Sequence, residues 1–249
     1  MTDIHSHILP CVDDGSGSME ESLLMLKAAA ECGADVIAAT PHFDSGKEYP
    51  GAYFETLADK LSSLRQETAF RHIRLAIVRG MEIMASERLP ELLAEGLLWT
   101  LGGTDYFLVE FASDDDPDRC SRILRRCKQR GFLPIIAHPE RYRFVRRAPQ
   151  IAYEWCRSGY GLQINKGSLL GRFGEGARDV ALRLISHGLA ACVASDAHGA
   201  YRRTTDMREV RTLLNEEFGE DHADLLLERN PDRILAGKEL RGFEPYPFI

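Results

Sequence analysis

The chain alternates between short apolar runs, typical of buried strands, and longer stretches with apolar residues every three or four positions, typical of helices. Strands are expected at 2–5, 36–40, 73–78, 105–111, 133–137, 161–164 and 189–194. Helices are expected at 19–32, 53–68, 89–95, 117–130, 150–158, 176–187, 206–218 and 220–229. The first helix has a clear start, because Ser18 stands at its N-cap and Glu21 completes a capping box.

About seven strand–helix units follow one another, and no linker rich in proline, serine or charge divides them. Such repeats predict a parallel sheet covered by helices, and we expect residues 1–249 to form a single domain. An open doubly wound sheet would satisfy this pattern. A closed barrel is favoured because polar residues recur at the carboxyl ends of almost all strands, where barrel enzymes build their sites.

Histidines and carboxylates gather at these strand ends. His5 and His7 are one residue apart, so on a strand they point to the same face. The other members of the set are His42, Glu82, Glu110, His138, Asp196 and His198, with Asp13 and Asp14 in the first loop. A lone histidine at a strand end is more often a hydrogen-bonded structural residue, but five such histidines among eight favour a metal site. One ion takes about four to six ligands, so the set predicts two or three divalent ions that share a carboxylate.

Composition limits the function classes. The formal net charge of −7 disfavours general nucleic-acid binding, and with it a nuclease or proofreading domain. No apolar run approaches the ~20 residues of a membrane span, and the N-terminus lacks a signal-peptide pattern. We therefore expect a cytoplasmic protein without membrane insertion, whose six scattered cysteines are free thiols.

The segment from Cys120 to Arg126 matches the C-x5-R spacing of cysteine phosphatases. That chemistry needs a loop of backbone N–H groups around the phosphate, usually with glycine. This segment has no glycine, and Ile123, Leu124 and Cys127 recur at helical spacing. We expect a helix whose basic residues form a solvated face.

Taken in order, the motifs resemble those of the PHP (polymerase and histidinol phosphatase) superfamily. They are Asp3-x-His5-x-His7, Thr40-Pro41-His42, Gly80-x-Glu82, Val109-Glu110-Phe111, 137–142 and 194–198. The segments 5–10, 13–15 and 138–142, with Leu162-Gln163-Ile164-Asn165-x-Gly167-Ser168-Leu169, are similar to the bacterial capsule and exopolysaccharide tyrosine phosphatases of the CpsB/CapC/YwqE type. The similarity extends over about residues 3–230.

The resemblance implies an α/β fold of the PHP type, a distorted (β/α)7 TIM-like barrel with three metal ions at its carboxyl rim. His5, His7, Glu82 and Asp196 would hold one ion, and Glu82, Glu110 and His138 a second. His42 and His198 would hold the third with either Asp13 or Asp14. Manganese is the ion usually discussed, although Fe, Zn, Co and Mg also accept mixed histidine and carboxylate ligands. Arg141 and Arg203 fall where the family has phosphate-binding arginines, and Arg202 competes for the second role.

The implied activity is a metal-dependent protein-tyrosine phosphatase that uses a metal-activated hydroxide. Its substrate would be the phosphotyrosine tail of a polysaccharide-synthesis kinase. Glu110 stands where other PHP branches have histidine, which favours this branch. The alternatives are a small-molecule phosphatase, for example of histidinol phosphate, and a non-catalytic metal-binding regulator. The sequence gives no indication of the oligomeric state.

Overall fold

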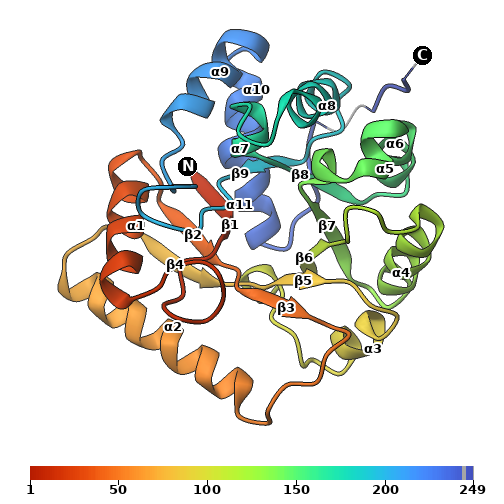
Figure 1. Ribbon diagram of the computed structural model, residues 1–249. Helices are drawn as coiled ribbons and strands as arrows, with labels where there is room; N and C mark the ends of the chain where they lie inside the picture. Colours follow the sequence, from red (N-terminus) through yellow and green to blue (C-terminus); the bar gives the residue numbers. More distant parts are fainter. Residues whose placement is uncertain (243–244, 249) are drawn as a thin grey trace.

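The computed structural model describes residues 1–242 and 245–248, and its strands pair in parallel in two sheets (Figure 1). The first sheet has the order β1-β2-β4, and the second has the order β3-β5-β6-β7-β8-β9. The strands are β1 (Thr2–Ser6), β2 (Val36–Ala39), β3 (His42–Asp44), β4 (Ala76–Arg79), β5 (Glu82–Met84), β6 (Tyr106–Glu110), β7 (Leu133–Ala137), β8 (Gly161–Asn165) and β9 (Cys192–Ala194). The predicted α/β class with parallel sheets is therefore confirmed.

Helices surround both sheets (Figure 1). They are α1 (Met19–Glu31), α2 (Tyr53–Phe70), α3 (Leu89–Ala94), α4 (Pro117–Gln129), α5 (Arg143–Arg147), α6 (Gln150–Arg157), α7 (Lys166–Leu169), α8 (Glu175–Ser186), α9 (Arg208–Phe218), α10 (Glu220–Asp224) and α11 (Asn230–Leu235), with short turns η1 (Leu101–Gly103), η2 (Pro139–Arg141) and η3 (Leu225–Arg229). The Ser18 hydroxyl accepts a hydrogen bond from Glu21 N at 3.1 Å, as expected of the N-cap of α1. Over the described ranges, none of these helices is long and apolar enough to cross a membrane.

Two short strands, β3 and β5, were not predicted. Each follows an observed strand, β2 or β4, after a two-residue interruption at Thr40-Pro41 or at Gly80-Met81, so the strand predicted at 36–40 ends one residue early. Pro41 has no N–H to donate to the sheet. A Cβ on Gly80 would lie 2.9 Å from Thr40 Cγ2, so glycine is needed where the chain passes from one sheet to the other.

The expected closed barrel is not formed as one continuous sheet within the described residues. β1 meets the segment after β9 through one isolated parallel bridge between Ser6 and Ala197. Two backbone hydrogen bonds accompany the bridge, from His7 N to Ala197 O (2.8 Å) and from Asp196 N to His5 O (2.9 Å). Asp196 has a left-handed φ of 48°, which turns the chain and ends the ladder after three residues of β9.

A small apolar cluster lies beneath the carboxyl ends of the strands and draws members from both sheets. Ile4 of β1, Leu108 of β6, Ile135 of β7 and Ala194 of β9 are fully buried in it, together with Ile234 of α11. Burial of each large apolar side chain stabilises the folded protein by about 1.5–3 kcal/mol. This cluster supports the strand ends, so the polar side chains beyond them have a rigid base.

The predicted helix over 117–130 is confirmed as α4, which removes the cysteine-phosphatase alternative. Cys120 is fully buried on its inner face, and burial raises the pKa of the thiol. The basic face is solvated and paired with acidic neighbours: Arg126 donates to Glu87 Oε2 at 2.8 Å, and Arg130 donates to Glu91 Oε1 at 2.6 Å. A thiol in this setting is not a nucleophile.

Candidate metal centre

Four buried side chains converge on one point: His5 in β1, His7 just after it, Glu82 at the start of β5 and Asp196 just after β9. His5 Nε2 lies 3.2 Å from Glu82 Oε2 and 3.4 Å from Asp196 Oδ1. His7 Nε2 lies 3.3 and 3.6 Å from the same two oxygens. All four side chains are at most 1% exposed. The side-chain set that the resemblance assigns to one ion is thus assembled in space.

Within the described residues, the two facing carboxylate oxygens, Glu82 Oε2 and Asp196 Oδ1, are buried and have no hydrogen-bond partner, although the imidazoles lie near them. A buried, unsatisfied charged oxygen is costly and needs a compensating group. Two imidazoles and two carboxylates are donors that borderline divalent cations accept, so the residues present fit such an ion.

The electrostatics of the group favour a positive charge at this point. Burial alone lowers the pKa of His5, but the charges of Glu82 and Asp196 outweigh it and raise the pKa overall. Burial alone raises the pKa of Asp196, and His5 and His7 reverse this and hold it well below its usual range. A protonated imidazole and a divalent cation are therefore alternative ways of balancing the same carboxylates.

A second group shares Glu82. His42 Nδ1, at the start of β3, lies 3.1 Å from Glu82 Oε2 and 3.3 Å from Glu110 Oε1, at the end of β6. His138 Nε2, after β7, lies 2.8 Å from Glu82 Oε1 and 3.9 Å from Glu110 Oε2. His138 has a left-handed φ of 36°, and its N–H donates to Gln163 O, which fixes the turn that directs the ring inward. Glu82 thus joins the first group to the second.

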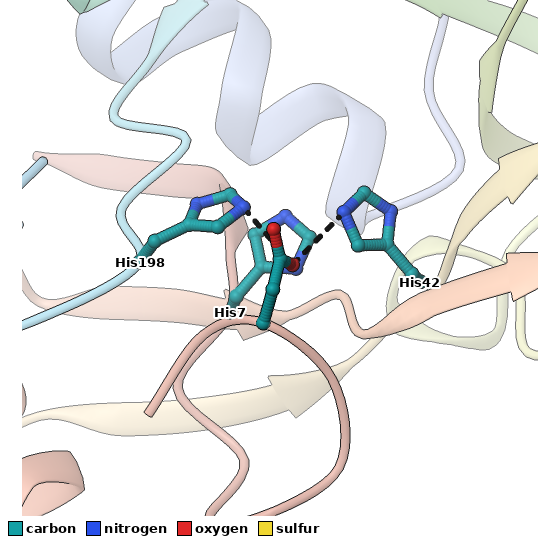
Figure 2. Close-up of side chains that lie close together, drawn as sticks. His7, His42 and His198 are labelled. Atoms are coloured by element: carbon teal, nitrogen blue, oxygen red, sulfur yellow. Dashed lines mark ion pairs between the residues drawn. The ribbon is translucent and has the colours of Figure 1, made fainter. Parts of the chain in front are cut away.

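A third group lies nearer the surface, where three imidazoles surround one carboxylate (Figure 2). Asp14 Oδ1 lies 3.3 Å from His42 Nε2 and 3.5 Å from His198 Nε2. The His7 and His198 ring centroids are 3.9 Å apart. His7 and His42 each belong to two groups, so the three groups form one continuous cluster.

Asp13 occupies a different place from Asp14. Its Oδ2 lies 2.7 Å from His7 Nδ1 and accepts a hydrogen bond from His42 N at 3.0 Å. These bonds hold the His7 imidazole and the His42 backbone from behind, and they direct the remaining ring nitrogen of His7 into the cluster. The sequence alone could not tell which of the two aspartates faces the cluster. In the structure Asp14 faces the histidines, and Asp13 supports them from behind.

The strand pattern did not predict the polar residues behind the cluster. Gln163 Oε1 lies 2.8 Å from His5 Nδ1, and Asn165 Nδ2 donates to Asp196 Oδ2. Asp3 Oδ1 accepts hydrogen bonds from His5 N and Ser195 N. The available signal is that Gln163 and Asn165 alternate along the otherwise apolar strand β8, so both face the cluster.

Two arginines border the cluster at Asp196. Arg141 Nη1 donates to Asp196 Oδ2 at 3.2 Å, and Arg203 Nη2 donates to the same oxygen at 2.6 Å. Their side chains are 32% and 33% exposed, so each connects the cluster to solvent. Arg202 is exposed, whereas Arg203 is half-buried with a left-handed φ of 47°.

Known proteins are similar to this chain over most of its length. A sequence model described as "Capsular polysaccharide synthesis, CpsB/CapC" matches residues 1–236. The tyrosine-protein phosphatase YwqE of Bacillus subtilis is 36% identical over 257 residues, covering 98% of this chain and 100% of YwqE. The putative tyrosine-protein phosphatase CapC of Staphylococcus aureus is 32% identical over 210 residues, covering 84% of this chain and 82% of CapC.

A solved structure of a protein from this group is similar to the chain over its full length. It comes from crystal structures of YwqE from Bacillus subtilis and CpsB from Streptococcus pneumoniae, described as unique metal-dependent tyrosine phosphatases. Its TM-score with this chain is 0.92 at 33% sequence identity, and the match covers 100% of both chains. The chain therefore belongs to the CpsB/CapC family of capsular polysaccharide synthesis proteins.

Proposed function

We propose that this protein is a metal-dependent tyrosine phosphatase that hydrolyses phosphotyrosine in proteins. The observation that carries the proposal is the buried group of His5, His7, Glu82 and Asp196, in which two carboxylate oxygens find no hydrogen-bond partner among the described residues. YwqE, which is named a tyrosine-protein phosphatase, matches nearly the whole chain. The proposed reaction is the hydrolysis of a phosphoric monoester.

We assign three divalent ions, with Mn²⁺ as the expected metal. His5, His7, Glu82 and Asp196 would hold the first, and Glu82, Glu110 and His138 the second, with His42 close by. His42, His198 and Asp14 would hold the third, next to His7. When bound, such ions neutralise phosphate oxygens and lower the pKa of a coordinated water. Glu82 is common to two of these groups, so it would serve as a ligand in both.

The chain's own residues then bind and orient the phosphate. Arg141 and Arg203 present guanidinium N–H groups beside the cluster, where charge builds on the phosphate oxygens. Asn165 holds Asp196 in place from behind. The leaving phenol has an ordinary pKa near 10, so departure of the tyrosyl oxygen makes little demand on an acid from the protein.

The exposure of the outer residues favours a protein substrate. His42 is 37% exposed and Asp14 is 67% exposed, whereas Glu82 below them is 1% exposed. A cluster that rises from the interior to the surface suits a phosphotyrosine carried on a flexible segment. The tyrosine-rich tail of a polysaccharide-synthesis kinase is the partner that we propose.

We also infer that the strands act as a distorted seven-stranded barrel within one domain, residues 1–249. β3 follows β2 across Thr40-Pro41, and β5 follows β4 across Gly80-Met81, so each pair counts as one interrupted strand. The Ser6–Ala197 bridge places the last unit beside the first. This arrangement would explain why side chains from β1, β5, β6, β7 and β9 reach one site.

The proposed substrate class is tested by comparing kcat/KM of the Mn²⁺-loaded protein for three compounds. They are a phosphotyrosine peptide, the same peptide with phosphoserine, and histidinol phosphate. We expect the phosphotyrosine peptide to be hydrolysed fastest. A higher kcat/KM for histidinol phosphate would instead make this a small-molecule phosphatase, and no turnover of any of them would favour a metal-binding regulator.

A further inference from the structure

Phe173, in the loop between α7 and α8, lies against both arginines of the site. The guanidinium carbon of Arg141 is 4.5 Å from the centroid of its ring, and that of Arg203 is 5.7 Å away. The two arginines come from different segments, after β7 and after β9. One aromatic ring therefore connects the two cations that the proposed function assigns to phosphate.

A glycine makes room for the ring. A Cβ on Gly167 would lie 2.6 Å from Phe173 Cε2 and 3.3 Å from Cδ2, so a larger residue there would push the ring away. Gly167 N donates to Asn165 Oδ1 at 2.7 Å, and Asn165 Nδ2 donates to Asp196 Oδ2. That oxygen also accepts from both arginines, so the ring, the amide and the carboxylate form one connected unit.

Lys166 fixes the loop that carries Arg203. This lysine is 1% exposed, and its Nζ donates to the carbonyl oxygens of Thr204 and Asp206. Within the same loop His198 N donates to Arg203 O at 2.8 Å. The segment Asn165-Lys166-Gly167 thus holds Asp196, the Arg203 loop and the Phe173 ring in one arrangement. These contacts give a structural role to the middle of the segment Leu162–Leu169, on which the family resemblance partly rests.

An aromatic ring suits this place better than a carboxylate would. Two guanidinium groups close together repel each other, and a ring face attracts both without cancelling their charge. Each arginine already donates one N–H group to Asp196 Oδ2. A cation–π contact uses the flat face of a guanidinium and takes no further N–H group, whereas a second carboxylate would compete with phosphate for those that remain.

We propose that Phe173 is a positioning residue for phosphate binding, which holds Arg141 and Arg203 with their N–H edges toward the phosphate. The inference rests on the proposed function for the identity of the phosphate ester. It concerns phosphate binding itself, which is measurable without turnover.

The test measures the Kd of inorganic phosphate for the metal-loaded protein by calorimetry, together with metal content. We expect Phe173→Leu to weaken phosphate binding by about 3–30-fold, the loss of a cation–π contact, with metal content unchanged. Phe173→Tyr keeps a ring and should bind as the wild type does. Tyr153→Leu is the matched control, because Arg157 lies over Tyr153 in α6 at 5.9 Å, and this change should leave the Kd unaltered.

An unchanged phosphate Kd in Phe173→Leu would overturn the inference. If that variant lost only turnover of an aryl phosphate, the ring would instead contact the substrate's aromatic group. Should Phe173→Leu fail to fold, Gly167→Ala replaces it as the test variant. This change keeps the Phe173 ring but displaces it, so it should also weaken phosphate binding. If wild-type protein binds phosphate through Phe173 yet hydrolyses no phosphotyrosine peptide, the positioning role stands and the proposed function fails.

Discussion

Asp13 and Asp14 are neighbours in the chain but have different surroundings. Asp13 is partly buried, and although burial raises its pKa, the hydrogen bond with His7 and the His7 charge lower it further, to about 2. Asp14 is 67% exposed and faces two imidazoles. Gly15 makes this possible, because a Cβ there would lie 2.3 Å from His7 O. Sequence spacing does not give the direction of a loop, so it could not separate the two residues.

We therefore expect Asp14→Asn and Asp13→Asn to differ in bound metal. Asp14→Asn should remove about one ion per chain after dialysis, because a proposed ligand is lost. Asp13→Asn should keep the ion number but weaken affinity by roughly 10–100-fold, since it disturbs only the support of His7. Elemental analysis of dialysed protein and a metal titration measure the two effects. The assignment is wrong if Asp13→Asn loses the ion and Asp14→Asn retains it.

Arg202 and Arg203 are a second pair of neighbouring residues with different surroundings. Arg203 touches Asp196, whereas Arg202 is exposed. Arg203→Ala should raise the KM for a phosphotyrosine peptide by about 10–100-fold, the loss of one hydrogen-bonded charge, and Arg202→Ala should change it by less than about threefold. Steady-state kinetics on both variants decide the matter, and an equal effect of the two would argue against the assignment of Arg203.

At the scale of elements, local signals predicted some boundaries and missed others. The predicted helices at 19–32 and 117–130 agree with α1 and α4 to within one residue, because caps and apolar spacing define them locally. β3 and β5 were missed because three residues carry too little pattern, and their pairing depends on neighbours distant in sequence. The strand predicted at 73–78 begins only at Ala76, because Ile73 N still bonds to Thr68 O at the end of α2.

Lys166, where β8 passes into α7, leads us to expect a pH dependence of the free energy of unfolding. Burial lowers the pKa of Lys166 from 10.5 to about 8, against the opposing charge of Asp3. Between pH 8 and 10.5 the unfolded chain keeps a proton that the folded chain has lost, so folded stability rises with pH. Relative to Lys166→Met, the wild type should gain up to about 3 kcal/mol in free energy of unfolding over this range. Urea unfolding of both proteins after chelation measures it, and parallel pH curves would contradict it.

At the scale of the whole molecule, the sequence predicted the parallel α/β class and which side chains meet. Strand ends of parallel units lie on one side, so residues as far apart as His5 and Asp196 come together. The sequence did not predict the division into two sheets. That division depends on Pro41, Gly80 and the turn at Asp196, whose effects appear only when the strands pack.

Metal removal should destabilise the whole chain, because it removes ions that only the folded state binds and leaves the buried carboxylates of Glu82 and Asp196 with protonated imidazoles alone to balance them. Binding at 100 times the Kd stabilises a folded protein by about 2.7 kcal/mol per ion. Chelation should therefore lower Tm by roughly 5–10 °C per tightly bound ion, and Mn²⁺ should restore it. Calorimetry with and without chelator measures this change. An unchanged Tm would mean that the cluster holds no ion that matters for stability.

The most direct test is metal content and phosphotyrosine hydrolysis measured on the same samples of wild type, His5→Ala and His187→Ala. His5 is fully buried in the first group, whereas His187, after α8, is outside the cluster and serves as the control. We predict that His5→Ala loses bound metal and hydrolysis together, by at least about 100-fold in kcat/KM, while His187→Ala retains both. A His5→Ala protein that lost its metal and still hydrolysed phosphotyrosine at the wild-type rate would contradict metal-dependent catalysis at this cluster.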